Sequence, residues 1–118
     1  MSDAPEKRYL VIIQLKDAST RRLQKIVPAI QSALARISSA PTESSFRSLG
    51  ADSFGYFIKT TLRPGQVAER IVAPGGRQTY QGDPPILDGG DGVFVLEIGA
   101  GWSATDEFSR ARTWLQRH

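Results

Sequence analysis

Tyr9-Leu-Val-Ile-Ile-Gln-Leu15 is the stretch of sequence that decides the fold. Its β-branched and aliphatic residues fill both alternating phases until Gln14, which is typical of a central strand in a sheet covered on at least one side. A second stretch of this kind, Val93-Phe-Val-Leu-Glu-Ile98, lies near the other end of the chain and stops at a glycine-rich turn. We therefore expect these stretches to form the first and last strands of one sheet.

Helix and strand patterns alternate between these two stretches. Apolar residues at three-and-four spacing predict a helix over about 19–38. Extended patterns predict strands over 46–49 and 54–62, joined by a turn short enough for an antiparallel hairpin. A proline followed by an apolar stripe predicts a short helix over 63–72.

A last helix is expected after the strand that ends at residue 98. Thr105 is predicted to be its N-cap, because a threonine side chain can accept a hydrogen bond from a free amide in the first turn. Its inner side should carry Phe108, Ala111, Leu115 and Trp114.

The order of these elements predicts an α+β fold, a ferredoxin-like βαββαβ sandwich with an antiparallel sheet and an additional C-terminal helix. The 118 residues suit one domain over 9–118, preceded by a disordered polar lead at 1–8. Both crossover helices should lie on one face of the sheet. Because the first and last strands are apolar in both phases, the other face then needs a cover, either the C-terminal helix or a second copy of the chain.

Composition excludes several kinds of chemistry. The chain has no cysteine, so it has no disulfide, no thiolate nucleophile and no cysteine-based metal site. Its one histidine, His118, is the last residue, which excludes schemes that need an internal histidine. We predict no cofactor and no metal. No segment is apolar enough to span a membrane, and the N-terminus lacks the features of a signal peptide, so we expect a soluble, cytoplasmic protein.

Residues 74–92 contain six glycines and three prolines and are expected to form a long loop before the last strand. Asp88 and Asp91 flank a glycine pair there, and with Asp83 they could form a weak cation site. Turn formation explains the Asp-Gly pairs better, because both residue types accept the backbone angles that turns require. A further alternative is that the loop closes over a small molecule near Arg77, Asp91 and Glu97.

Two residues of the last strand and the turn after it are candidates for a loop or interface site. Glu97 stands in an otherwise apolar strand, so a charged carboxylate there must face water, a partner or a basic residue. Trp102 follows the glycines that end the strand, and it could anchor a subunit interface or pack beneath the terminal helix.

Three segments together resemble a known family: Tyr9–Leu15, Ser53–Thr61 and Asp88–Ile98. They are similar to the ferredoxin-like superfamily of CRISPR-associated adaptation endonucleases, VapD-type ribonucleases and SinR-like proteins. In that superfamily the first strand ends in a tyrosine–aspartate pair, and the aspartates of two subunits are thought to bind a divalent metal. The matching positions here are Ile13 and Gln14, and a neutral amide is a poor ligand for magnesium. The resemblance therefore implies the fold more than the nuclease chemistry.

Basic residues concentrate in the first part of the chain. Residues 1–70 contain 11 Lys or Arg and 6 Asp or Glu, a net charge of +5, whereas residues 71–118 carry a net charge of −2. The predicted first helix places Arg21, Arg22, Lys25 and Arg36 on its polar side, where they could bind phosphates. A solvated helix face is the better interpretation of these residues. The aromatic residues Phe54, Tyr56 and Phe57 could stack on bases, but core packing is the better interpretation.

Three functions remain open on the sequence. The first is a non-catalytic binding or regulatory domain that works as a homodimer, with its open sheet face or strand edge completed by a second copy. The second is a nucleic-acid-binding or nuclease-like protein, and the third is a small-molecule binder or enzyme that uses residues 74–92 as a lid. No nucleophile and base can be named for an enzyme, so the first function is preferred.

Overall fold

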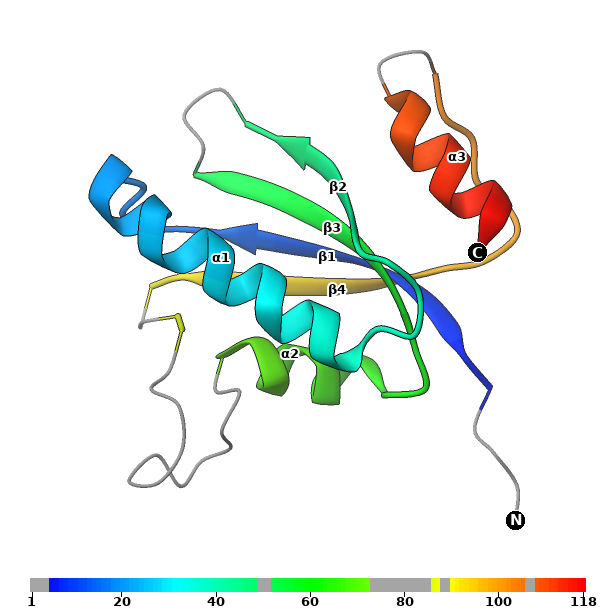
Figure 1. Ribbon diagram of the computed structural model, residues 1–118, viewed down its shortest axis with the longest axis horizontal. Helices are drawn as coiled ribbons and strands as arrows, with labels where there is room; N and C mark the ends of the chain where they lie inside the picture. The colour runs from blue at the N-terminus through cyan, green and yellow to red at the C-terminus, as the bar shows by residue number, and fades with distance from the viewer. Residues whose placement is uncertain (1–4, 49–51, 73–85, 88–89, 106–107) are drawn as a thin grey trace.

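The computed structural model describes residues 5–48, 52–72, 86–87, 90–105 and 108–118. Within these ranges the elements are β1 (Lys7–Gln14), α1 (Thr20–Ile37), β2 (Glu43–Arg47), β3 (Ser53–Thr60), α2 (Pro64–Val72), β4 (Gly92–Ile98) and α3 (Ser109–Arg117) (Figure 1). The predicted α+β class and the order of the elements are confirmed.

The four strands form one sheet in the order β2-β3-β1-β4, and every neighbouring pair is antiparallel. β1 therefore lies in the centre, between two strands that come much later in the chain. The hairpin predicted from the short turn is present as the β2–β3 pair. This arrangement is compatible with a ferredoxin-like fold.

The main core lies between the sheet and the two helices α1 and α2. Alternate residues of β1, namely Tyr9, Val11 and Ile13, are at most 1% exposed and point toward these helices. From α1 the core receives Ile26, Ile30 and Leu34, and from α2 it receives Val67 and Ile71. Both helices thus cover the same face of the sheet, and the other residues of β1 point away from them.

The bounds of three strands differ from the prediction, and β3 runs over Ser53–Thr60 instead of 54–62. β1 begins at Lys7 and so includes residues assigned to the disordered lead, because Lys7 and Arg8 pair with Thr60 and Lys59 of β3. The Arg8 side chain also donates hydrogen bonds to the carbonyl oxygens of Leu115 (3.0 Å) and Gly99 (2.8 Å). β2 runs from Glu43 to Arg47 instead of 46–49. Its polar sequence carries little strand signal, and its position is set by pairing with β3 across an irregularity between Ser44 and Phe46.

The start of α3 also differs. The helix begins at Ser109, and Thr105 is not its N-cap; its carbonyl oxygen instead accepts a hydrogen bond from the amide of Phe108 (2.8 Å). Phe108 occupies the N-cap position, outside the helical repeat, and is 41% exposed, so its predicted burial is wrong. The predicted burial of Ala111, Trp114 and Leu115 is confirmed.

Gly55 is a position where the sheet needs a residue without a side chain. A Cβ atom built there would lie 2.5 Å from Cε1 of Phe46, because the Phe46 ring covers this glycine from the neighbouring strand. We expect Gly55→Ala to lower the free energy of unfolding by about 1–3 kcal/mol, because the ring must leave its place. Urea unfolding followed by circular dichroism measures the loss.

Gly65→Ala is the matched control for this prediction. A Cβ at Gly65 meets no atom within 4 Å, and the residue lies inside α2, where alanine is the better helix former. This variant should be as stable as the wild type or more stable. Equal losses for the two alanine variants would contradict the steric explanation.

Candidate functional site

α3 covers one end of the sheet face that α1 and α2 leave free. Trp114 stacks on Phe57 of β3 with ring centroids 5.5 Å apart, and its indole N–H donates to the carbonyl oxygen of Pro41 (2.6 Å). Leu10 and Ile98 pack partly buried against this second cluster. The predicted cover by the C-terminal helix is therefore present, but it is incomplete.

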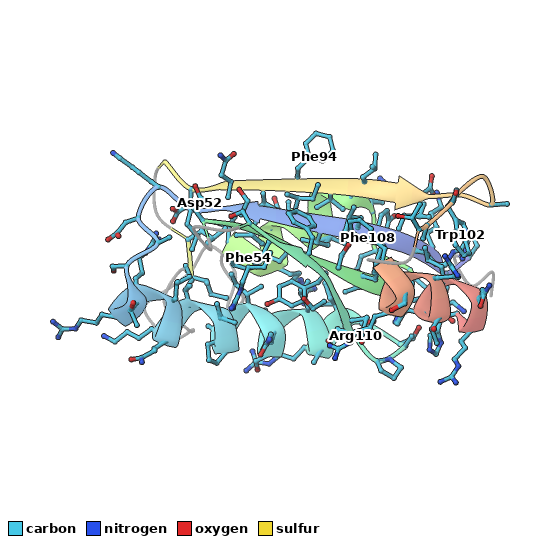
Figure 2. All side chains as sticks on the ribbon, turned by 90° about the horizontal axis from the view of Figure 1, so that it is seen from above. Asp52, Phe54, Phe94, Trp102, Phe108 and Arg110 are labelled. Atoms are coloured by element: carbon cyan, nitrogen blue, oxygen red, sulfur yellow. The ribbon has the colours of Figure 1, made fainter. Side chains whose placement is uncertain are left out.

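Beyond α3, the same face carries apolar side chains in contact with water. Phe94 is 60% exposed and Leu96 is 49% exposed. They lie opposite Ile12 and Leu10 of β1, respectively, in the sheet register. Figure 2 shows Phe94 pointing away from the side of the sheet on which α1 lies. We call Leu10, Ile12, Phe94 and Leu96 the open-face patch.

The two rows of residues that contain this patch are almost uncharged. One row crosses the sheet through Phe94, Ile12, Gly55 and Phe46. The next crosses through Leu96, Leu10, Phe57 and Glu43, so Glu43 on β2 is the one charged residue in the eight positions. Such a surface offers little electrostatic guidance to a charged ligand, and it is suited to burial against another apolar surface.

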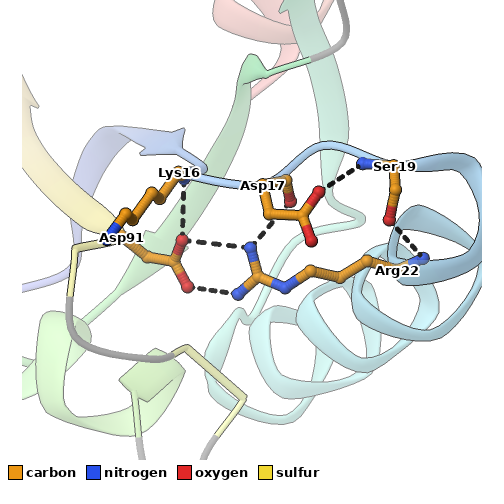
Figure 3. A network of polar contacts seen from close by, with 5 residues as sticks. All are labelled: Lys16, Asp17, Ser19, Arg22 and Asp91. Atoms are coloured by element: carbon orange, nitrogen blue, oxygen red, sulfur yellow. Dashed lines mark hydrogen bonds and ion pairs between the residues drawn. The ribbon is translucent and has the colours of Figure 1, made fainter.

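A polar cluster forms at the end of β1, where α1 and β4 begin (Figure 3). The Arg22 guanidinium binds both carboxylate oxygens of Asp91, through Nη1 to Oδ1 (3.1 Å) and through Nη2 to Oδ2. The same Oδ1 accepts a hydrogen bond from the Lys16 amide (2.9 Å), and Arg22 also donates to the carbonyl oxygen of Asp17 (2.8 Å). The Asp91 side chain is 1% exposed, so this ion pair is buried.

This cluster explains two residues that the sequence suggested for binding. Both carboxylate oxygens of Asp91 and the guanidinium of Arg22 are engaged with each other, and their bonds fix the start of α1 to the start of β4. Asp17 supports the same turn by accepting a hydrogen bond from the amide of Ser19 (3.0 Å), and the Ser19 side chain accepts one from the amide of Arg22 (3.4 Å). The arrangement is that of a structural clamp.

The other basic residues predicted on α1 lie on its outer side. Arg21, Lys25 and Arg36 are exposed, and their spacing of four and eleven residues places them on one face of the helix. Arg22 lies apart from them, with its side chain 19% exposed in the clamp. Nucleic-acid binding by this face stays a prediction.

Two candidates near the last strand, Glu97 and Trp102, have separate surroundings. Glu97 forms an exposed ion pair with Lys7 (3.3 Å), so its carboxylate faces a basic residue and water. Trp102 packs partly buried against the cluster beneath α3. Asp88 and Arg77 lie outside the described residues. The described candidates Asp91, Glu97 and Trp102 therefore have different partners, in the Arg22 clamp, with Lys7 and beneath α3, respectively.

The aromatic residues of β3 are buried, as the preferred interpretation predicted. Phe54 and Tyr56 belong to the main core, and Phe57 belongs to the cluster beneath α3. Burial raises the pKa of the Tyr56 phenol, while its contact with Gln31 and the charge of Arg47 act in the opposite direction. This tyrosine therefore stays protonated, and hydrogen-bonded to Gln31 (3.4 Å), near neutral pH.

The described residues contain neither a candidate metal site nor a helix that could span a membrane. No three of their His, Asp or Glu side chains are grouped in a way that could hold a metal ion. No helix within the described ranges is long and apolar enough to cross a membrane.

The open-face patch was only partly foreseeable from sequence. The apolar residues in both phases of β1 and β4 indicated an excess of apolar surface, but they did not show which part α3 would leave uncovered.

Comparison of the chain with protein-family models, with curated proteins and with solved structures found no match in any of the three.

Proposed function

We propose that this protein is a non-catalytic interaction domain of ferredoxin-like topology that works as a homodimer, with the open-face patches of two copies packed against each other. The observation that carries the proposal is the exposure of Phe94 (60%) and Leu96 (49%) in register with two further apolar side chains of the central strand. Water-exposed apolar side chains that lie side by side favour burial.

A second copy is the partner that fits this surface best. In a two-fold symmetric interface each patch meets its own counterpart, so a charged patch would repel itself. The open-face patch carries no charge. The molecule measures only 19 Å along its shortest axis, which is the thickness of a sheet with one helix layer. Two such sheets can pack face to face at about 10 Å, so a second copy supplies the missing layer.

The size of the patch suggests a dimer of moderate affinity. A standard stable interface buries about 800 Å² on each partner. Two rows across four strands, with strands about 4.8 Å apart, amount to only a few hundred Å² of flat surface. Neighbouring residues of β4 and α3 must therefore contribute. We expect a dissociation constant of the dimer in the micromolar range, because burying a partly exposed Phe or Leu side chain contributes only about 1–2 kcal/mol to the free energy of association.

The proposal assigns no catalytic residue. Gln14 lies at the end of β1, where the resemblance noted in the sequence would need a carboxylate for metal-dependent cleavage. Asp17, the next acid along the chain, is part of the turn that precedes α1.

The dimer is tested by replacing both exposed residues of β4. Size-exclusion chromatography with light scattering should show a dimer for the wild type at micromolar concentration and a monomer for the double variant Phe94→Ser, Leu96→Ser. Both side chains point into water in the single chain, so the variant should keep its circular dichroism spectrum.

Val72→Ser is the matched control for this experiment. Val72 is an exposed apolar residue (40%) on α2, which covers the opposite face of the sheet. This variant should dimerise like the wild type. A wild-type protein that stays monomeric throughout this range, or a double variant that still dimerises, would refute the proposal.

A further inference from the structure

A groove of about 470 Å³ lies between α3 and the chain that leads into β2. Its volume falls within the range of about 300–1,000 Å³ that is usual for small-molecule sites. One side of the groove is formed by α3, and the other is formed by residues 41–43. The groove is separate from the patch proposed for dimerisation, since none of the four patch residues lines it.

Two arginines of α3 line this groove, and their side chains bind no other group in the described part of the chain. Arg110 and Arg117 are seven residues apart, which is about two helical turns, so they lie on the same side of the helix. Within the described residues, neither guanidinium forms a hydrogen bond or an ion pair. By contrast, Arg112 on the other side of α3 donates to the carbonyl oxygen of Ala104 (2.7 Å).

The groove is also lined by an acidic residue, Glu43, and by the aromatic side chain of Trp114. Glu43 is half-buried and lines the groove from the β2 side. Trp114 also lines the groove, and it contacts the rings of Phe57 and His118 and donates a hydrogen bond to the carbonyl oxygen of Pro41. Because these contacts fix α3 relative to β2, the backbone positions that carry the two arginines and the glutamate are set before any ligand arrives.

From this arrangement we propose that the groove binds a phosphate monoester that carries hydroxyl groups, the chemistry shared by nucleotides and sugar phosphates. Arg110 and Arg117 bind the phosphate, because the planar guanidinium presents paired N–H donors that match phosphate oxygens. Glu43 accepts hydrogen bonds from the hydroxyl groups, since a carboxylate can only accept. The hydroxyl of Ser109, which also lines the groove, is available as a further donor to the phosphate.

The position of Glu43 favours a monoester over a long polyanion. A nucleic-acid strand would place several phosphates along the groove, and at least one of them would approach this carboxylate and be repelled. A ligand with one phosphate and a neutral hydroxylated body can place its phosphate at the arginines of α3 and its hydroxyl groups at Glu43.

Isothermal titration calorimetry with the full chain tests the proposal, using ribose 5-phosphate, AMP, inorganic phosphate and ribose as probes. We expect ribose 5-phosphate or AMP to bind more tightly than inorganic phosphate, and ribose to show no binding. Arg110→Gln and Arg117→Gln should each weaken binding by about tenfold or more, the usual effect of losing a hydrogen-bonded charge. The two organic probes distinguish a site for sugar phosphates from a site for nucleotides.

Two further variants sharpen the test. Glu43→Gln should leave inorganic phosphate binding unchanged or stronger and should reduce the advantage of ribose 5-phosphate. Arg70→Gln, which removes an exposed arginine from α2, should bind all probes like the wild type. The proposal is overturned if no phosphate compound binds, if the double variant of Arg110 and Arg117 binds as well as the wild type, or if single-stranded RNA binds while the monoesters do not.

Discussion

Replacing Asp91 by alanine is expected to lower the free energy of unfolding by about 3–5 kcal/mol, the largest effect that we expect of any polar substitution among the described residues. The Asp91 carboxylate is 1% exposed and accepts hydrogen bonds from Arg22 and from the Lys16 amide. Its removal takes the only carboxylate in this cluster's ion pair away from a mostly buried guanidinium, and it removes the acceptor that Asp91 offers to the Lys16 amide. Chemical unfolding at neutral pH, followed by circular dichroism and tryptophan fluorescence, measures the loss.

Glu97→Ala is the control for this prediction, because it breaks an ion pair of the same strand at the surface. The side chains of Lys7 and Glu97 are 50% and 51% exposed, so their interaction is screened by water, and its loss should cost less than about 1 kcal/mol. If the two alanine variants lose the same stability, the Arg22–Asp91 pair is no stronger than a surface pair and does not act as a clamp.

Trp114→Ala should release α3 from the sheet and cost about 3–5 kcal/mol, as removal of a large buried aromatic side chain usually does. Trp114 is 5% exposed, stacks on Phe57 and donates a hydrogen bond to the carbonyl oxygen of Pro41. A helix of nine residues is too short to persist alone in water, so an undocked α3 should unfold. Hydrogen exchange followed by mass spectrometry should show faster exchange over 109–117.

The rest of the molecule supplies the reference for this experiment. Amides of β1 and α1 belong to the main core on the opposite face of the sheet, so they should keep most of their protection in the Trp114 variant. Trp114→Phe keeps a ring on Phe57 and loses only the indole hydrogen bond, so it should cost about 1 kcal/mol. Unchanged exchange over 109–117 in Trp114→Ala would mean that α3 is held by other contacts.

The elements with continuous apolar patterns were predictable from the sequence. β1, α1, α2 and β4 each bury residues at the spacing that their own segment displays. β2 was placed incorrectly because Glu-Ser-Ser-Phe-Arg contains one apolar residue, and the strand exists through its pairing with β3. The start of α3 was placed incorrectly because a threonine can cap a helix only if the chain turns at that residue, which depends on tertiary contacts.

The candidate sites were less predictable because each joins residues that are distant in sequence. Arg22 and Asp91 are 69 positions apart, and each was interpreted alone, as a phosphate-binding cation and as a loop acid. The groove joins Glu43 to Arg110 and Arg117, which no sequence motif connects. The seven-residue spacing of the two arginines was the one available signal, and it is too common on helices to identify a site without the opposite wall.

The central position of β1 has a consequence for the synthesis of this protein. β1 is made first, yet its two neighbours in the sheet are β3 and β4, and the second of these ends only at Ile98. During translation, Tyr9, Val11 and Ile13 are therefore synthesised before either neighbouring strand, and the edge that pairs with β4 stays unpaired after β3 has been made. Apolar strand residues without paired neighbours are prone to aggregation, and the four-stranded sheet can close only after Ile98 has been synthesised.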